Sequence, residues 1–169
     1  MIPPSPWVER HLDSLPAGGR ILDLACGSGR HARLLAARGH PVLAVDRDAG
    51  ALVALAACPG VNTRVADLEG SDWPLAGQQF AGVIVTNYLW RPRLRDVCAL
   101  LESGGVLIYE TFMVGNEAYG KPSNPDFLLR AQELRAVAAA AGLREIAFEE
   151  GYVATPKPAL RQAICAVRE

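Results

Sequence analysis

The sequence has few cysteines and no pattern that predicts a metal site. Four cysteines stand far apart among its 169 residues, at positions 26, 58, 98 and 165. They form no C-x-x-C pair, and no histidine stands at the spacing of a zinc ligand. We therefore predict free thiols in a reducing compartment, with neither a disulfide framework nor a bound metal.

The sequence also lacks a surplus of charge and a long apolar run. Its formal net charge is −1, without a basic tail, so it does not predict strong attraction to nucleic acid or to an anionic membrane. No run approaches the ~20 apolar residues of a membrane-spanning helix. The stretch MIPPSPWVERHLDSLP has neither the cationic start nor the apolar segment of a signal peptide. We expect a cytoplasmic protein.

Half of the residues are hydrophobic, which is enough for a substantial core in a chain of this length. No repeat, low-complexity tract or interdomain linker interrupts the sequence. We therefore expect one domain over residues 1–169. Residues 1–19 predict a leading helix and a linker, because Ser5 followed by Pro6 is typical of a helix start.

The most informative stretch is RILDLACGSGRHARLLAARGHPVLAVD, from Arg20 to Asp46. An apolar run, a glycine turn, an alanine-rich helical pattern and a second apolar run predict strand, turn, helix and strand. Gly27 and Gly29 let the backbone approach a ligand closely, and the free N–H groups at the helix start face that ligand. The carboxylate of Asp46 can accept two hydrogen bonds from a ribose. The unit is typical of a site for a nucleoside-containing cofactor.

Two cofactors fit this unit. The segment from Gly27 to Ala32 matches the dinucleotide fingerprint G-x-G-x-x-A, and Asp46 stands about the expected ~20 residues further on. This interpretation gives an NAD(P)-binding oxidoreductase. Asp23, however, would repel a pyrophosphate, whereas it complements the sulfonium and ammonium groups of S-adenosylmethionine.

Three segments resemble one enzyme family. LDLACGSG is similar to motif I, and VLAVD to motif II, of class I S-adenosylmethionine-dependent methyltransferases, and ESGGVLIYET resembles the turn and fifth strand of their fold. The resemblance implies an α/β fold with a doubly wound, mostly parallel seven-stranded sheet and an antiparallel last strand. It also implies S-adenosylmethionine as the cofactor, bound by Asp23, Ala25, Gly27, Gly29, Asp46, Arg47, Asp67, Leu68 and Asn87.

The remaining sequence pattern agrees with this fold. Helices are expected at 30–38, 49–57, 93–101 and 131–141, and further strands at 61–66, 80–86, 106–110, 143–153 and 159–167. Residues 69–79 are rich in turn formers and predict no helix. Strand ends are expected at Asp46, Asp67, Asn87 and Glu110. Because the carboxyl ends of parallel strands meet at one edge of a sheet, these four side chains should surround one crevice.

The resemblance places the amino acid end of the cofactor at the glycine turn, the ribose at Asp46 and the adenine at Asp67 with the following residue. Asn87 would lie beside the methyl group. It is followed by tyrosine and leucine, not by the Pro-Pro and aromatic residues of enzymes that methylate planar amino nitrogens, which argues against that chemistry. We predict that Asn87, Tyr88 and Arg91 position a small-molecule acceptor, with no catalytic base evident.

Residues 112–128 form a long segment without periodicity, rich in glycine, proline and asparagine. Structureless loops longer than ~12 residues are uncommon in compact domains unless they are binding loops or lids. We predict a substrate lid, similar to the loop of small tellurite-resistance-type methyltransferases. A module that binds the cofactor and a partner without catalysis is a further interpretation, because a sequence does not reveal an acceptor pocket.

Overall fold

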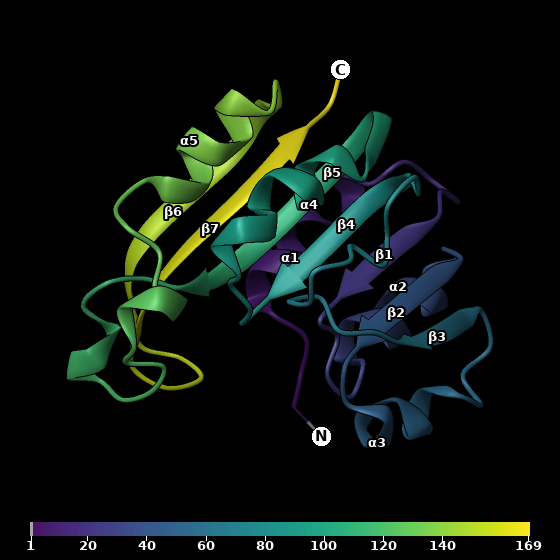
Figure 1. Cartoon of the computed structure of the whole chain (residues 1–169), viewed down its shortest axis with the longest axis horizontal. Coiled ribbons are helices and arrows are strands. Elements are labelled where there is room, and N and C mark those ends of the chain that lie inside the picture. Colours follow the sequence, from purple (N-terminus) through teal and green to yellow (C-terminus); the bar gives the residue numbers. More distant parts are fainter. Residues whose placement is uncertain (1) are drawn as a thin grey trace.

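The computed structural model describes residues 2–169, which form a sheet of seven strands with helices on both faces (Figure 1). The strands are β1 (Ile21–Leu24), β2 (Val42–Asp46), β3 (Val61–Val65), β4 (Phe80–Thr86), β5 (Leu101–Phe112), β6 (Arg144–Val153) and β7 (Ala159–Val167). The α-helices are α1 (Pro6–His11), α2 (Arg30–Ala37), α3 (Ala49–Leu52), α4 (Leu94–Ala99) and α5 (Glu133–Ala140).

The strand order is β3-β2-β1-β4-β5-β7-β6. Strands β1 to β5 pair in parallel, and only β7 runs against its neighbours β5 and β6. The predicted doubly wound sheet with an antiparallel last strand is therefore confirmed. The chain changes direction across the sheet between β1 and β4, and ligands of such sheets bind at the carboxyl ends of the strands near that switch point.

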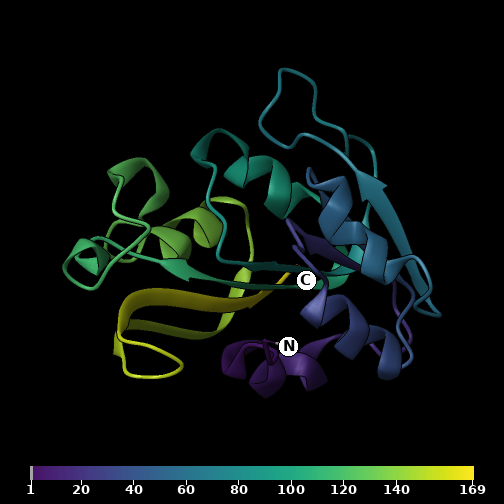
Figure 2. The same ribbon diagram turned by 90° about the horizontal axis from the view of Figure 1, so that it is seen from below.

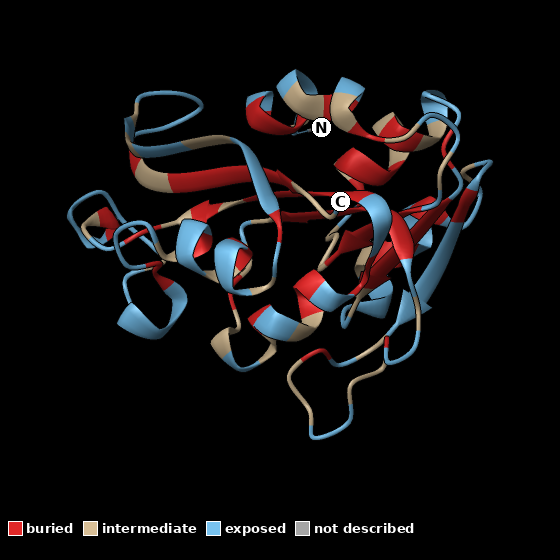
Figure 3. Ribbon diagram, turned by 90° about the horizontal axis from the view of Figure 1, so that it is seen from above, coloured by how far each residue is buried: buried red, intermediate tan, exposed pale blue. Residues whose placement is uncertain are grey.

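The sheet is buried between two hydrophobic layers because its apolar side chains alternate between its faces. Leu22 and Leu24 of β1 pack toward the layer that contains α4 and α5, whereas Ile21 packs toward α1 and α2. Figure 2 shows these helix pairs on opposite sides of the sheet. Figure 3 shows the central strands buried and the outward faces of the helices exposed.

Several helix starts follow from the capping residues in the sequence. The hydroxyl of Ser5 accepts hydrogen bonds from the N–H groups of Trp7 and Val8 and so starts α1, as predicted. Asp48 caps α3 in the same way. None of the helices within residues 2–169 is long and apolar enough to cross a membrane.

Two expected elements differ from the structure. The helix expected at 49–57 is α-helical only to Leu52 and tightens into a 3₁₀ turn over Val53–Leu55. The turn expected at residues 102–105 lies inside β5, which begins at Leu101. The register with β4 jumps from Phe80–Leu101 to Gly82–Val106, because a bulge absorbs the extra residues and Gly104 takes a φ of 80° there.

Candidate active site

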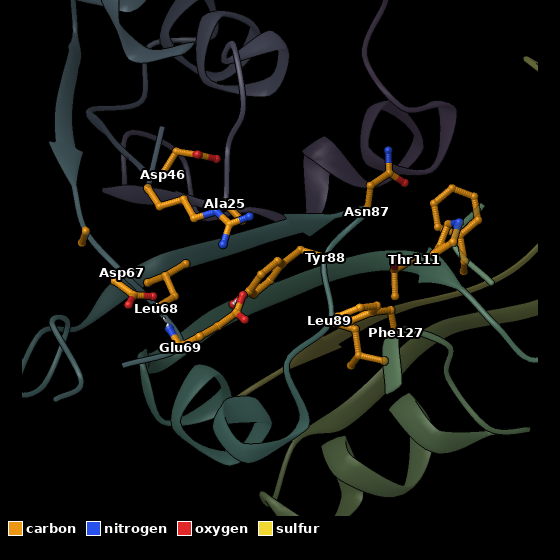
Figure 4. Close-up of a pocket in the computed structure, with 14 residues that line it drawn as sticks. Ala25, Asp46, Asp67, Leu68, Glu69, Asn87, Tyr88, Leu89, Thr111 and Phe127 are labelled. Carbon is orange, nitrogen blue, oxygen red and sulfur yellow. Dashed lines mark hydrogen bonds between the residues drawn. The ribbon is translucent and has the colours of Figure 1, made fainter. Parts of the chain in front are cut away.

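A cavity of about 410 Å³ lies at the carboxyl ends of the central strands. Figure 4 shows its two sides. Asp46, Asp67, Leu68 and Glu69 lie on one side, Asn87, Leu89, Thr111 and Phe127 lie on the other, and Tyr88 lies between them. The volume falls in the range of small-molecule sites. A bound ligand would therefore contact carboxylates on one side of the cavity and mostly apolar side chains on the other.

The structure brings most of the sequence-predicted residues together here. Those that line the cavity are Ala25, Asp46, Arg47, Asp67, Leu68, Asn87 and Tyr88. Asp23, Gly27, Gly29 and Arg91 are not among its lining residues. Three of the four residues expected to surround the crevice, Asp46, Asp67 and Asn87, therefore line the cavity. Glu110 does not line it and instead pairs with Arg161.

Asp46 stabilises the glycine turn through hydrogen bonds. Its two carboxylate oxygens accept from the N–H groups of Gly27 and Asp48, each at 2.9 Å. Gly27 has a φ of 58°, and a Cβ at this position would meet no atom within 4 Å. Gly29 has a φ of 85°, and its Cβ would lie 2.3 Å from a methyl carbon of Leu55. The first glycine thus leaves open space, whereas the second permits close packing.

This difference predicts separate effects for two matched substitutions. Gly29→Ala should lower the free energy of unfolding by roughly 2–3 kcal/mol, because it combines a left-handed backbone with a clash in the core. Gly27→Ala should cost only about 1 kcal/mol, since only the backbone conformation is unfavourable. Its methyl group would instead occupy the open space beside the turn, where the sequence resemblance places S-adenosylmethionine, and should weaken binding of the product S-adenosylhomocysteine. Urea unfolding and calorimetric titration of both variants check this; equal stability losses would contradict it.

Two non-glycine residues at the cavity also have left-handed backbones. Ala25 has a φ of 53° and Asn87 a φ of 55°. Asparagine tolerates this conformation, whereas alanine there costs about 1 kcal/mol. Strained backbone of this kind concentrates at functional sites, where the surrounding structure maintains it.

Asp23 is buried beneath the first turn of α2 rather than exposed in the cavity. It is 2% exposed, and its Oδ2 has no hydrogen-bond partner. Burial raises its pKa to about 8, and the N–H of Ala32 and the charge of Arg30 lower it only in part. An unsatisfied buried carboxyl is costly unless it keeps its proton or receives a donor.

A second buried titratable group, His31, ties the N-terminal segment to α2. Its Nε2 accepts from the N–H of Ser5 at 2.9 Å, and the side chain is 2% exposed. Burial, with the charge of Arg30, lowers its pKa to about 4. The hydrogen bond from Ser5 requires the neutral imidazole.

Asp23 and His31 should change the free energy of unfolding in opposite directions as the pH rises. Between about pH 4 and 6.5 the unfolded chain protonates His31 and the folded chain does not, so this group lowers stability on acidification by on the order of 3 kcal/mol. The folded pKa of Asp23 is raised, so this group lowers stability as pH rises from about 4 to 8.

We therefore expect a nearly constant free energy of unfolding from pH 4.5 to 6.5 and a fall of about 2 kcal/mol from pH 6.5 to 8. Urea unfolding at these three pH values measures it. Asp23→Asn should abolish the alkaline fall, and His31→Gln should extend that fall down to about pH 4. A steep acid loss in the unmodified protein would show that Asp23 does not hold its proton.

A polar cluster on the far side of Asn87 was not predicted. Arg161 of β7 donates to Asn87 Oδ1 at 2.6 Å and to Glu110 Oε1 at 3.1 Å. The same Glu110 oxygen accepts from the hydroxyl of Ser5 at 2.7 Å, and the Arg161 guanidinium lies 4.5 Å from the ring centre of Phe112. The sequence shows only an arginine in an apolar strand, so no local signal could have identified it.

Arg91 ties together segments that are distant in the sequence. It forms a two-pronged ion pair with Glu133, at 2.7 and 2.8 Å, and its other donors bond the backbone oxygens of Pro125, Asp126 and Leu128. All five guanidinium N–H groups are thereby used. Burial alone would raise the pKa of Glu133, but the hydrogen bonds from Arg91 and from Arg130 outweigh it and lower the pKa. These contacts give Arg91 a structural role, and its predicted role toward substrate receives no support from them.

Tyr88 separates the two sides of the cavity. Its hydroxyl donates to Glu69 at 3.2 Å. Burial, together with the charge of Glu69, raises the pKa of Tyr88 well above its usual range. The phenol is therefore neutral at physiological pH and acts as a hydrogen-bond donor.

The segment 112–128 is anchored at its base. Buried Asn116 accepts from the N–H of Leu160 at 3.0 Å and donates to the carbonyl of Pro122 at 3.1 Å. Pro122 and Phe127 line the cavity, while the Phe127 side chain is 42% exposed. The tip of this loop thus borders both the cavity and the solvent.

The cavity lining is acidic. It contains three carboxylates, from Asp46, Asp67 and Glu69, and one cation, Arg47. Within residues 2–169 no cluster of three histidine, cysteine or acidic residues could hold a metal ion. A doubly wound sheet with a glycine turn and carboxylates at its strand ends defines a binding protein for a nucleoside-containing cofactor.

Comparison with known proteins identifies the family. Residues 21–105 match the methyltransferase domain, and the chain therefore belongs to this family. The resemblance to class I methyltransferases is therefore confirmed. No curated protein is similar enough in sequence to be counted as a relative.

Solved structures share the fold at low sequence identity. TehB from Haemophilus influenzae has a TM-score of 0.77 at 15% identity, covering 96% of this chain and 61% of TehB. A SAM-dependent methyltransferase from Methanosarcina mazei has a TM-score of 0.73 at 17% identity, covering 99% of both chains. The glycopeptide N-methyltransferase MtfA, in complex with S-adenosyl-L-homocysteine, has a TM-score of 0.65 at 19% identity, covering 96% of this chain and 88% of MtfA. The chain thus spans less than two thirds of the length of TehB.

Proposed function

We propose that the protein transfers the methyl group of S-adenosylmethionine to a small-molecule acceptor. The observation that carries this proposal is the shared cavity of Asp46, which ends β2, and Asp67, which follows the neighbouring β3, beside the glycine turn. Carboxylates suit a ligand that is cationic and lacks phosphate, whereas the pyrophosphate of NAD(P) would be repelled.

The residues present fit this cofactor. The open space at Gly27 leaves room for a ligand against the turn. Asp46 has lone pairs beyond the two that its backbone contacts use, so it can still accept from ribose hydroxyls. Asp67 and Leu68 would bind the adenine. The amino acid end of the cofactor would be bound by Ala25, Gly27 and Arg47, and Asn87 would lie beside the methyl group. Asp23 and Gly29, which the sequence also assigned to the cofactor, are buried beneath α2 and against Leu55, so they would support the turn from behind.

When bound, S-adenosylmethionine supplies an activated methyl group: the acceptor atom bonds to the methyl carbon, the carbon–sulfur electron pair stays on sulfur, and any acceptor proton leaves to water. The chain itself contributes positioning, which can provide most of the rate enhancement. Arg161 occupies Asn87 Oδ1, so the Asn87 NH₂ group is the part that can bind an acceptor. Tyr88 stays neutral beside it.

The proposed acceptor region is closed by residues 112–128. Pro122 and Phe127 border the cavity from this loop. Asn116 bonds Pro122, and Arg91 bonds the backbone on both sides of Phe127, which supports a lid that is held in place over the acceptor region. We propose that residues 1–169 act as one domain. Its leading segment, 1–19, would be held against α2 and β5 by the hydrogen bonds of Ser5 with His31 and Glu110.

Calorimetric titration of the unmodified chain with S-adenosylmethionine, S-adenosylhomocysteine and NADH tests the proposal. Binding of both adenosyl ligands without binding of NADH is the expected result. NADH binding alone would favour an oxidoreductase. Adenosyl binding with a stable protein complex, and without turnover across a broad acceptor panel, would favour a non-catalytic module.

A further inference from the structure

We propose that the acceptor is an uncharged, mostly apolar molecule, and that the chain excludes oxyanions and carboxylates from its acceptor site. This inference rests on the proposed function and names the substrate class of the same site. It follows from two observations. The arginines near the acceptor side of the cavity are already paired with carboxylates, and the side chains that line the acceptor side are mostly apolar.

The acceptor side of the cavity presents little charge. Leu89, Phe112, Pro122 and Phe127 supply apolar surface, and Thr111 supplies one hydroxyl. Together with the Asn87 amide they can enclose an apolar body and bind one polar atom. Ligand sites with this lining select by shape and by a small number of hydrogen bonds.

The two arginines that could attract an anion from this side are both engaged. Arg91 uses all five N–H groups on Glu133 and on three backbone carbonyls, outside the cavity lining. Arg161 is 14% exposed and pairs with Glu110, whose side chain is 15% exposed. Glu110 therefore cancels the one positive charge that touches the lining residues Asn87 and Phe112.

The opposite side of the cavity adds repulsion. Three carboxylates line it, against the single cation Arg47. In a partly enclosed cavity these charges are weakly screened, so an anionic acceptor would be disfavoured by roughly tenfold or more relative to a neutral molecule of the same shape.

A matched pair of probes tests this directly. Benzamide and benzoate have nearly the same shape and differ by one charge, so their affinities for the protein saturated with S-adenosylhomocysteine can be compared by ligand-observed NMR. We expect benzamide to bind at least about tenfold more tightly than benzoate. Equal affinities or a preference for benzoate would overturn the inference, as would methylation of selenite or tellurite.

Two variants separate the cause. Glu110→Gln leaves Arg161 unpaired and should shift the preference toward benzoate. Phe127→Lys places a cation on the exposed lid wall, where folding should tolerate it, and should also raise benzoate affinity, whereas Phe127→Met should not. A wild-type preference for benzamide that neither charge-changing variant alters would refute the electrostatic explanation.

The same experiment distinguishes this inference from the proposed function. Saturation with S-adenosylhomocysteine is measured first by calorimetry, and absence of that binding would reject the proposed function and the inference with it. Binding of S-adenosylhomocysteine followed by a preference for benzoate would reject the inference alone.

Discussion

Replacing Asp46 by alanine is expected to weaken S-adenosylhomocysteine binding by roughly 100- to 1,000-fold, which corresponds to about 3–4 kcal/mol. The substitution removes the proposed ribose ligand. It also removes the acceptor for the N–H groups of Gly27 and Asp48, so the glycine turn loses the hydrogen bonds that stabilise it. Calorimetric titration of the purified variant measures the loss.

Asp48→Ala is the matched control for this variant. Asp48 is an exposed carboxylate two residues away that caps α3 by accepting from Gly50 and Ala51, and it does not line the cavity. Its loss should lower stability by about 1 kcal/mol through the missing cap and leave the affinity within about twofold. If both variants weakened binding equally, general charge at this edge, and not a ligand role of Asp46, would be responsible.

Replacing Arg91 by alanine is expected to lower the free energy of unfolding by roughly 3–5 kcal/mol. The change leaves the Glu133 carboxylate, which is 13% exposed, without its bidentate partner and removes the donor of the Asp126 and Leu128 carbonyls. Urea unfolding gives the stability, and amide hydrogen exchange should accelerate in residues 125–133 because the clamp on this segment is lost.

The exposed Arg95, on the neighbouring helix α4, provides the control. Arg95→Ala should change stability by no more than about 0.5 kcal/mol. The affinity of Arg91→Ala for S-adenosylhomocysteine should stay unchanged, since Arg91 does not line the cavity. A stability loss below 1 kcal/mol for Arg91→Ala would contradict the structural role.

The unit from β1 to β2 was predictable because its determinants are neighbours in the chain. Apolar runs, two glycines and a terminal aspartate specify strand, turn, helix and strand through local backbone preferences and side-chain periodicity. Asp46 and Asp67 could likewise be placed at one edge, because parallel strands in a doubly wound sheet all end on the same side. The sequence by itself thus determined the fold class, the family and the edge of the sheet where these carboxylates meet.

Only the tertiary structure decided which side chains pair across that edge. Arg161 reaches Asn87 from 74 residues away, and Arg91 reaches Glu133 from 42 residues away. These pairs depend on strand register and on how α5 and the 112–128 loop pack, which no local pattern encodes. The burial of Asp23 beneath α2 has the same origin. Contacts between segments distant in the sequence therefore decide which side chains face the cavity and which ones stabilise the structure around it.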